Sequence, residues 1–265
     1  YYLKTGFILI KKFIFINVRF GYFYRLKVLM KTKDWFTDWF NTSYYHILYK
    51  DRSDEEARLF MKNITTFLPL PKTTHILDLP CGKGRHSVFL NSLGYKVTGA
   101  DLSENSIKTA KKFENDSLKF KVHDMRQPIN NQYDAIFNLF TSFGYFKEDK
   151  EDILILENIK NGLKKEGVFV FDFLNADFVK TTLVPKETKT VDAITFHITR
   201  EIKDGFIIKN ITFFADKKNH SYTERVKNLN ADKMKTYFEK AGFKITNVFG
   251  DYNLTNFDAQ NSNRL

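Results

Sequence analysis

The sequence predicts an α/β fold, a doubly wound and mostly parallel sheet with an inserted antiparallel β lid. Short apolar runs alternate with runs of helical period between residues 75 and 173, which is typical of a parallel sheet covered by helices on both faces. A turn that contains Gly82 and Gly84 follows the first apolar run. After Asn175 the pattern changes to alternating polar and apolar residues joined by short turns, which indicates an antiparallel meander.

The chain ahead of the sheet is predicted to be helical over residues 34–66. Aromatic residues recur there at one-turn spacing, and Ser53 precedes three acidic residues in the manner of an N-cap. Pro69 and Pro71 end this pattern. The aromatic residues are Trp35, Phe36, Trp39 and Phe40.

Apolar runs mark the predicted strands of the sheet, at residues 75–79, 96–100, 118–122, 133–140 and 168–173. Helices are predicted between them at residues 85–93, 103–113 and 152–163. Gly94 and Ser103 support these bounds, because glycine favours the C-terminal cap of a helix and serine the N-terminal cap.

The lid is predicted at about residues 190–227, from alternating runs at residues 194–202, 206–214 and 221–226. A helix at residues 231–241 and a strand at residues 244–248 then resume the α/β pattern. We therefore expect a single domain over residues 30–265, interrupted by the lid. Residues 263–265 resemble the start of a further strand, so we expect the natural chain to continue beyond them.

Residues 1–29 differ from the rest of the chain. They begin with Tyr1 rather than Met and consist mostly of aromatic, aliphatic and basic residues. Their apolar runs fall short of the ~18 residues that a membrane-spanning helix needs, and no small-residue cleavage site follows them. We expect Met30 to be the natural start and residues 1–29 to be a non-native or disordered extension. A basic membrane-surface helix is the main alternative.

The formal net charge of +11 raises the question of a nucleic-acid partner. Six of the 42 basic residues lie in residues 1–29, which contain no acidic residue, so 36 basic and 31 acidic residues remain. These are spread along the chain instead of forming a basic stripe, and we expect no nucleic-acid partner. The single cysteine, Cys81, excludes an internal disulfide and favours a reducing compartment, the cytoplasm.

Polar side chains follow the predicted strands at the edge where ligands bind in doubly wound sheets. Asp78 lies near the end of the first strand, ahead of Gly82 and Gly84, which let a ligand approach the backbone closely. Asp101 ends the second strand, where a carboxylate can hold both hydroxyls of a ribose. Asp124 and Asn138 follow the next two strands. The pattern therefore predicts a site for one adenosine-containing ligand.

The stretch Leu77-Asp78-Leu79-Pro80-Cys81-Gly82-Lys83-Gly84-Arg85-His86 resembles the glycine motif of the class I S-adenosylmethionine-dependent methyltransferases. The resemblance covers roughly residues 34–263 and implies a Rossmann-like methyltransferase fold with S-adenosylmethionine as cofactor. Pro80 departs from the motif, since most of the family has a glycine there, and proline removes an amide donor from the turn.

The resemblance also implies roles for individual residues. Asp78, Gly82 and Gly84 would form the cofactor loop, with Asp101 at the ribose and Asn138 near the methionine portion. Asp124 and Met125 would receive the adenine. Further residues expected at the cofactor are Leu102, Arg85 and Tyr45.

Methyl transfer from a sulfonium needs mainly alignment of the acceptor and exclusion of water, so no prominent catalytic motif is expected. Tyr145 and His197 are the candidates for positioning the acceptor or taking its proton. No pattern of metal ligands is present, and oligomeric state is left open. We expect a small-molecule acceptor, methylated on nitrogen or oxygen, because residues 138–141 lack the Asn/Asp-Pro-Pro-aromatic sequence of enzymes that methylate nucleic-acid bases.

Three alternatives stay open at this point. An RNA or protein methyltransferase would need a basic, aromatic-lined groove beside the cofactor. A NAD-dependent oxidoreductase would need a third glycine where the chain has Ser87. A non-enzymatic module that binds the cofactor is the third.

Overall fold

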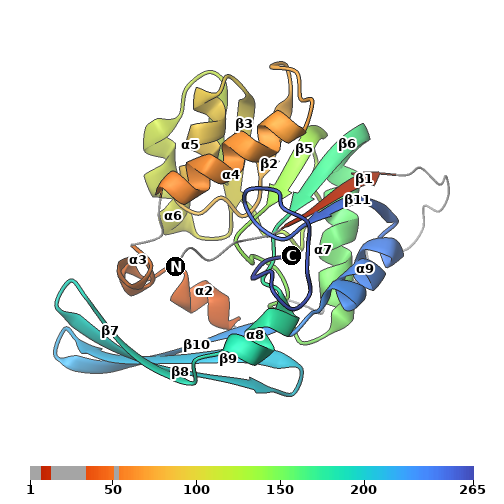
Figure 1. The fold of residues 1–265 in the computed structure, drawn as a ribbon. Helices are drawn as coiled ribbons and strands as arrows, with labels where there is room; N and C mark the ends of the chain where they lie inside the picture. Colours follow the sequence, from red (N-terminus) through yellow and green to blue (C-terminus); the bar gives the residue numbers. More distant parts are fainter. Residues whose placement is uncertain (1–6, 13–33, 51–53) are drawn as a thin grey trace, which may run out of the picture.

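A computed structural model describes residues 7–12, 34–50 and 54–265 of the chain. A seven-stranded sheet lies between two layers of helices, and a four-stranded antiparallel sheet lies beyond one end of it (Figure 1). Helices α2 and α3 lie between the two sheets. Met30 and Ser53, the predicted start and the predicted N-cap, fall outside the described residues.

Five neighbouring strands of the large sheet run parallel, in the order β6-β5-β2-β3-β4. Their bounds are β2 (His75–Asp78), β3 (Lys96–Asp101), β4 (Leu118–Val122), β5 (Tyr133–Asn138) and β6 (Leu163–Phe171). The connecting helices are α5 (Arg85–Ser92), α6 (Glu104–Ala110) with the 3-10 turn η1 (Lys111–Phe113), and α7 (Asp149–Gly162). The doubly wound fold predicted from the sequence is confirmed.

The helix boundaries follow from local chemistry. Gly94 follows α5 with a φ of 92°, and the Ser103 hydroxyl accepts a hydrogen bond from Ser106 N at the start of α6. Both predicted caps are therefore confirmed. Helix α7 begins three residues earlier than predicted, at Asp149.

The two faces of the sheet bury separate hydrophobic clusters, because successive side chains of a strand point to opposite faces. Leu77, Ile136 and Phe169 contact the cluster on the side of α7 and α9. Ile76 and Phe137 contact the other, on the side of α5 and of α4 (Asp54–Phe67). Strands buried on both faces give the continuous apolar runs that the sequence shows.

Strand β1 (Phe7–Lys12) lies antiparallel between β6 and β11 (Phe243–Phe249), with helix α9 (Ala231–Lys240) ahead of β11. The sequence analysis placed residues 1–29 outside the fold, whereas the structure includes Phe7–Lys12 as a strand. An apolar run of four residues, here Phe7–Ile10, suits a sheet position as well as an extension, and the sequence alone offers no way to tell its partner strands. The domain boundary at residue 30 stays a prediction.

The lid contains one strand more than predicted. It consists of β7 (Lys186–Val191), β8 (Ile194–Lys203), β9 (Phe206–Ala215) and β10 (Lys218–Lys227). Strand β7 is largely exposed at the edge of the lid, so it lacks the apolar alternation that marks the other three. Helix α8 (Ala176–Thr182), also missed, leads into the lid.

The end of the lid is fixed to the core by Lys227. This buried side chain pairs with Asp152 Oδ2 at 2.6 Å and Asp149 Oδ1 at 2.8 Å, both on α7. Its backbone N donates to Gly144 O at 2.7 Å. Strand β10 therefore leaves the lid at a point held by both backbone and charge.

The aromatic segment ahead of the sheet forms three helices, α2 (Trp35–Trp39), α3 (Ser43–Leu48) and α4, in place of one long helical region. The Thr42 hydroxyl caps α3 by accepting from Tyr45 N at 3.1 Å. Trp39 is fully buried and packs with Phe196 and Ile211 on the inner face of the lid. No helix in the described part of the chain is both long and apolar enough to cross a membrane.

Candidate functional site

The carboxyl ends of the parallel strands gather the polar residues that the sequence singled out. Strands β2, β3 and β5 end at Asp78, Asp101 and Asn138, and Asp124 follows β4 by two residues. Since parallel neighbours end at the same edge, these side chains share one end of the sheet. Helices α2 and α3 and the lid lie beyond this end (Figure 1).

The glycine turn is built for close approach. Gly82 has a φ of 55°, and a Cβ added there would meet nothing within 4 Å, so open space lies in front of it. Gly84 has a φ of 87°, and a Cβ there would lie 2.7 Å from the Phe120 ring. The first glycine therefore leaves room for a ligand, whereas the second lets the turn pack on β4.

Asp78 lies beneath this turn, fully buried. Its Oδ2 accepts a hydrogen bond from the Ser87 hydroxyl at 2.6 Å, so Ser87 has a specific role at the position where a dinucleotide motif has glycine. Its Oδ1 has no hydrogen-bond partner among the described residues. Burial raises the pKa of this carboxyl to about 7.

Asn138 is a second buried side chain with an unsatisfied acceptor. Its Nδ2 donates to Leu79 O at 2.9 Å and to Ser142 O at 3.3 Å, which ties the end of β5 to the glycine turn. Its Oδ1 has no partner in the described ranges of the chain. Buried acceptors of this kind are normally paired, so they point to a donor that a ligand supplies.

Asp101 holds the glycine turn in addition to its predicted role. Its Oδ2 accepts from Gly82 N and its Oδ1 from Ser103 N, both at 2.8 Å. Burial raises the pKa of the Asp101 carboxyl, and these two amides oppose the rise. Each carboxylate oxygen has two acceptor positions, so both can still accept from ribose hydroxyls.

Arg126, which the sequence analysis did not identify, occupies the Asp124 carboxylate. The guanidinium binds Asp124 with Nε and with NH2, the latter 2.6 Å from Oδ2, and its NH1 lies 2.7 Å from Asp34 Oδ2. In the sequence, the Asp-x-Arg spacing of Asp124 and Arg126 was the signal for this pair.

Met125, between Asp124 and Arg126, packs into the core cluster, and its carbonyl accepts from Asn158 Nδ2 at 3.2 Å. Leu102 is partly buried against the same cluster.

Helices α2 and α3 are tied to these strand ends at two points. The first is the Arg126–Asp34 pair, because Asp34 is the N-cap residue of α2. The second joins the Ser103 hydroxyl to Asn41 Oδ1 at 2.9 Å, in the turn between the two helices. The α2–α3 segment is therefore attached to the sheet beside Asp124 and beside Asp101.

Tyr145 lies in an aromatic enclosure beneath α2. Its ring centroid is 5.3 Å from Trp35, 5.7 Å from Phe36 and 5.7 Å from Phe40. Its hydroxyl donates to Thr141 O at 2.8 Å, in the turn after β5. Tyr45 on α3 extends the enclosure, 4.9 Å from Phe40. The structure thus places Tyr145 and Tyr45 in one aromatic cluster at the end of β5.

Arg85 begins α5 directly after the glycine turn. Its guanidinium lies 5.1 Å from the Phe140 ring centroid, and its NH1 is 3.9 Å from Asp54 Oδ1 on α4. The side chain therefore runs along the outside of the turn after β5. A contact with the cofactor carboxylate stays a prediction.

The structure does not bring His197 to this region. Strand β8 directs Phe196 and Ile198 inward, where they are buried against α2 and α3, and His197 outward, where it is exposed. A strand period of two decides this, because the apolar neighbours take the inner face. His197 lies beside Thr188 on the outer face of the lid, so the expectation that it is catalytic is corrected.

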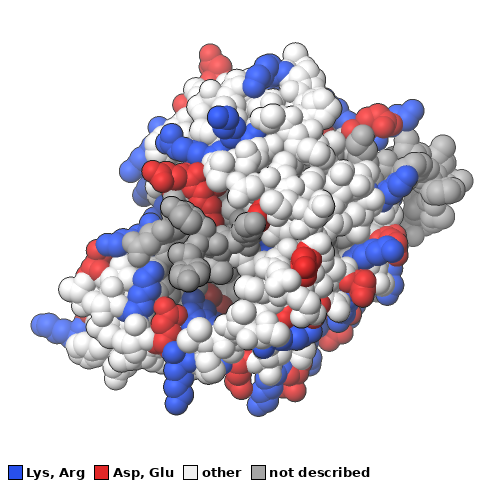
Figure 2. Space-filling view, viewed as in Figure 1, with Lys and Arg blue, Asp and Glu red and all other residues white. Residues whose placement is uncertain are grey.

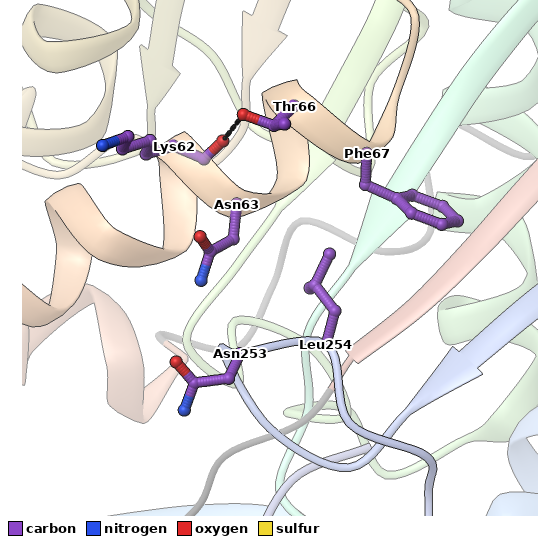
Figure 3. A pocket seen from close by; sticks show the side chains of 6 residues that line it. All are labelled: Lys62, Asn63, Thr66, Phe67, Asn253 and Leu254. Atoms are coloured by element: carbon purple, nitrogen blue, oxygen red, sulfur yellow. Dashed lines mark hydrogen bonds between the residues drawn. The ribbon is translucent and has the colours of Figure 1, made fainter.

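An open groove of about 420 Å³ lies away from the sheet edge, between the end of α4 and the loop after β11. Figure 3 shows Lys62, Asn63, Thr66 and Phe67 along one wall and Asn253 and Leu254 along the other. None of the predicted site residues lines it, and we assign it no part in the site.

Charge on the face drawn in Figure 2 gives no phosphate-tracking pattern. On the face that Figure 2 shows, Lys and Arg are interspersed with Asp and Glu, with no continuous basic surface among the described residues. The largest uninterrupted area of that face is uncharged.

The residues at the sheet edge fit S-adenosylmethionine. The unpaired acceptors Asp78 Oδ1 and Asn138 Oδ1 suit the ammonium group of its methionine portion. Asp101 suits the ribose hydroxyls, and the open space at Gly82 suits a ligand that passes over the turn. The adenine side is less free, since Arg126 already binds both oxygens of Asp124.

The sequence profile described as "Methyltransferase domain" matches residues 70–242. This span runs from the loop before β2 to the end of α9, so it contains the whole strand edge described above and the lid.

Two curated relatives illustrate the range of similarity. A putative methyltransferase, YqeM of Bacillus subtilis, is 28% identical over 210 residues, which cover 74% of this chain and 83% of that protein. The glycine N-methyltransferase of Rattus norvegicus is 28% identical over 124 residues, with 40% of this chain and 42% of that protein covered.

Solved structures share the fold. An S-adenosylmethionine-dependent methyltransferase from Clostridium acetobutylicum superposes with a TM-score of 0.70 at 19% identity, covering 83% of this chain and 93% of that one. The sugar N-methyltransferase KedS8 from Streptoalloteichus superposes with a TM-score of 0.60 at 17% identity, covering 75% and 83%.

Proposed function

Because this chain belongs to the family of class I S-adenosylmethionine-dependent methyltransferases, we propose that its methyl acceptor is a small molecule, methylated on nitrogen or oxygen. The family match rules out the NAD-dependent oxidoreductase alternative. The observation that carries the proposal is the aromatic cluster of Trp35, Phe40, Tyr45 and Tyr145, which lies beyond the sheet edge where α2 and α3 cover it.

The attachment of the α2–α3 segment to both sheets favours a small acceptor over a macromolecule. The α2–α3 segment is held to the sheet by Arg126–Asp34 and Ser103–Asn41, and to the lid by a carboxylate, Glu224, on β10. A polymer would need an open, basic channel, and the face in Figure 2 has mixed charge. Similarity to a glycine N-methyltransferase and, in fold, to a sugar N-methyltransferase supports the same acceptor class.

The residues of the chain have distinct parts in the proposed reaction. Bound S-adenosylmethionine supplies an activated methyl group. Asp78 and Asn138 would hold the methionine ammonium, and Asp101 the ribose, which fixes the sulfonium relative to the end of β5. The aromatic rings of Trp35 and Phe40 would exclude water, and Tyr145 would orient the acceptor next to Thr141.

The test is a binding and turnover screen. Calorimetric titration with S-adenosylmethionine, S-adenosylhomocysteine and NADH should give micromolar binding of the first two and none of the third. Formation of S-adenosylhomocysteine would then be followed with glycine, amino sugars and hydroxylated analogues, and with total RNA and casein as macromolecular acceptors. Turnover with RNA or casein, and none with small molecules, would contradict the proposal.

A further inference from the structure

The turn that follows β5 has an unusual backbone. Phe140 and Thr141 have φ angles of 58° and 60°, in the left-handed region that residues other than glycine rarely adopt. A bulky aromatic and a β-branched residue in succession are strained there, and such strain persists only where the surroundings hold it in place. The contacts of this turn should therefore show what holds it.

Asp172, directly after β6, holds both residues. Its Oδ2 accepts a hydrogen bond from Phe140 N at 2.6 Å, and its backbone O accepts one from Thr141 N at 3.0 Å. Its own N donates to Asn138 O at 2.9 Å, so Asp172 makes three hydrogen bonds to the segment 138–141. The Asp172 side chain is fully buried, and burial raises the pKa of its carboxyl. A fully buried carboxylate is stable in its ionised form only when a positively charged group pairs with it.

Arg264 supplies that partner from the far end of the chain. Its Nε lies 2.8 Å from Asp172 Oδ1 and its NH2 2.6 Å from Oδ2, the bidentate geometry that makes the strongest Arg–carboxylate pairs. The backbone around Arg264 is itself fixed, because Leu265 N donates to Phe173 O at 2.8 Å and Leu265 is fully buried. The Tyr252 hydroxyl adds a longer contact of 3.3 Å to Asp172 Oδ2.

The turn that Asp172 and Arg264 hold lies between the glycine turn and the aromatic cluster, and it contacts residues of both. The Phe140 ring stacks on His86, in the first turn of α5 after the glycines, with centroids 4.9 Å apart. Asn138, just before the turn, binds Leu79 O, and Tyr145, just after it, binds Thr141 O. A change in the φ angles of Phe140 and Thr141 would move Asn138 and Tyr145 relative to the glycine turn.

We infer that Arg264 and Asp172 are a positioning pair for methyl transfer, which holds the left-handed turn at Phe140 and Thr141 so that Asn138 faces the cofactor correctly and Tyr145 keeps its place beside the turn. Neither residue needs to touch a ligand. The inference concerns cofactor geometry, so it does not depend on which acceptor class is right.

The first test is Arg264→Met, which keeps the length of the side chain but leaves Asp172 without its charge partner. We expect the calorimetric Kd for S-adenosylhomocysteine to rise about tenfold or more in the folded variant, because an unpaired buried carboxylate disrupts what it binds. Arg200→Met is the matched control. It breaks the Arg200–Glu187 pair on the lid, and the Kd should change less than about twofold.

The second test asks whether the pair acts through backbone strain. Glycine adopts positive φ without cost, so in a Thr141→Gly background the turn needs less support. Arg264→Met should then raise the Kd about threefold or less, in place of about tenfold. Equal losses in the two backgrounds would overturn the inference, because they would mean that Arg264 does not act through the turn.

Stability is measured alongside, since a structural role would also lower it. If Arg264→Met does not fold, Arg264→Lys retains the charge with fewer donors, and Asp172→Asn combined with Arg264→Met removes both charges. Each should fold and raise the Kd for S-adenosylhomocysteine between about twofold and tenfold. A lower unfolding midpoint with an unchanged Kd would show that the pair merely supports the fold, and would overturn the inference.

Discussion

The proposed cofactor half and the proposed acceptor half of this site are built by different means. At the cofactor half, Asp78, Asp101 and Asn138 end three neighbouring strands of one sheet, and backbone amides of Gly82 and Ser103 fix the Asp101 carboxylate. At the acceptor half, α2 and α3 meet lid strands far away in the sequence, as in the Trp39 Nε1 hydrogen bond to Glu224 at 2.7 Å across 185 residues. The first half is specified by local sequence, whereas the second depends on which distant segments come together.

The two halves should therefore respond differently to substitution. A change at a strand end of the cofactor half removes a contact that no other segment can replace. A change at the acceptor half alters how the two short helices α2 and α3 are held against the lid. The predictions below separate the two halves by measuring cofactor affinity and cover stability independently.

The largest effect is expected from Asp101→Ala. The variant loses the ribose contacts and also the acceptor for Gly82 N and Ser103 N, so cofactor binding should weaken by about 2–4 kcal/mol. Calorimetry with S-adenosylhomocysteine measures this, with the exposed Asp116→Ala as control. Unchanged affinity in the folded variant would contradict the ribose assignment.

A smaller effect, confined to the acceptor half, is expected from Glu224→Gln. Its carboxylate accepts from Trp39 Nε1 and, at 2.6 Å, from the Tyr49 hydroxyl, with Lys209 Nζ 3.7 Å away. Removing its charge should raise amide hydrogen exchange in residues 43–48 about tenfold, as for ~1–2 kcal/mol of lost pairing.

In the same variant the Kd for S-adenosylhomocysteine should stay within about twofold of the parent, if the two halves are independent. Glu187→Gln, which removes the charge from the partly exposed pair with Arg200 on the lid, is the matched control. A large change in that Kd would mean that the two halves cannot be separated as described.

The pH dependence of binding sharpens the description of the cofactor half. Burial places the pKa of Asp78 near 7, above its unfolded value of 3.8. The cofactor ammonium favours the ionised carboxylate, so affinity for S-adenosylhomocysteine should rise between pH 5.5 and pH 7 by up to about tenfold per unit.

Folding stability should change in the opposite direction over this range. Between pH 4 and pH 7 the folded protein retains a proton that the unfolded chain has lost, so the free energy of unfolding contributed by Asp78 falls as pH rises. Asp78→Asn should flatten both profiles. A sloping affinity profile that persists in Asp78→Asn would assign the titration to another group.

The smallest effect is expected from His197→Ala. Its side chain lies exposed on the outer face of the lid, so cofactor affinity and unfolding midpoint should both change little. Phe196→Ala, one residue away on the inner face, should destabilise the protein by about 3–5 kcal/mol. Loss of activity in His197→Ala with an otherwise unchanged protein would restore it as a catalytic candidate.

The sequence was sufficient to predict those features that depend on residues close together in the chain. The apolar run before Asp78, the glycines after it and the caps at Gly94 and Ser103 all depend on neighbours in sequence, and the structure has them as expected. The same pattern of a polar residue ending an apolar strand also marked Asp172, which was overlooked because no ligand role suggested itself.

The sequence was insufficient where tertiary contacts decide. Nothing local indicates that Arg126 would bind Asp34 across 92 residues, or that Arg264 would reach Asp172. Strand β7 carries no apolar alternation, because an exposed edge needs none. His197 was misplaced because alternation predicts two faces of a strand without naming which face meets the rest of the protein.

The fixed end of the lid at Lys227 has a consequence for how acceptor preference can change. The inserted sheet leaves the domain at a residue pinned by Asp149, Asp152 and Gly144, none of which contacts the glycine turn. A lid of different sequence would keep this attachment if it retained Lys227, but it would also have to bury Trp39 as Phe196 and Ile211 do. Exchange of the inserted sheet between relatives is therefore constrained at two places, the charged end at Lys227 and the apolar face that meets α2.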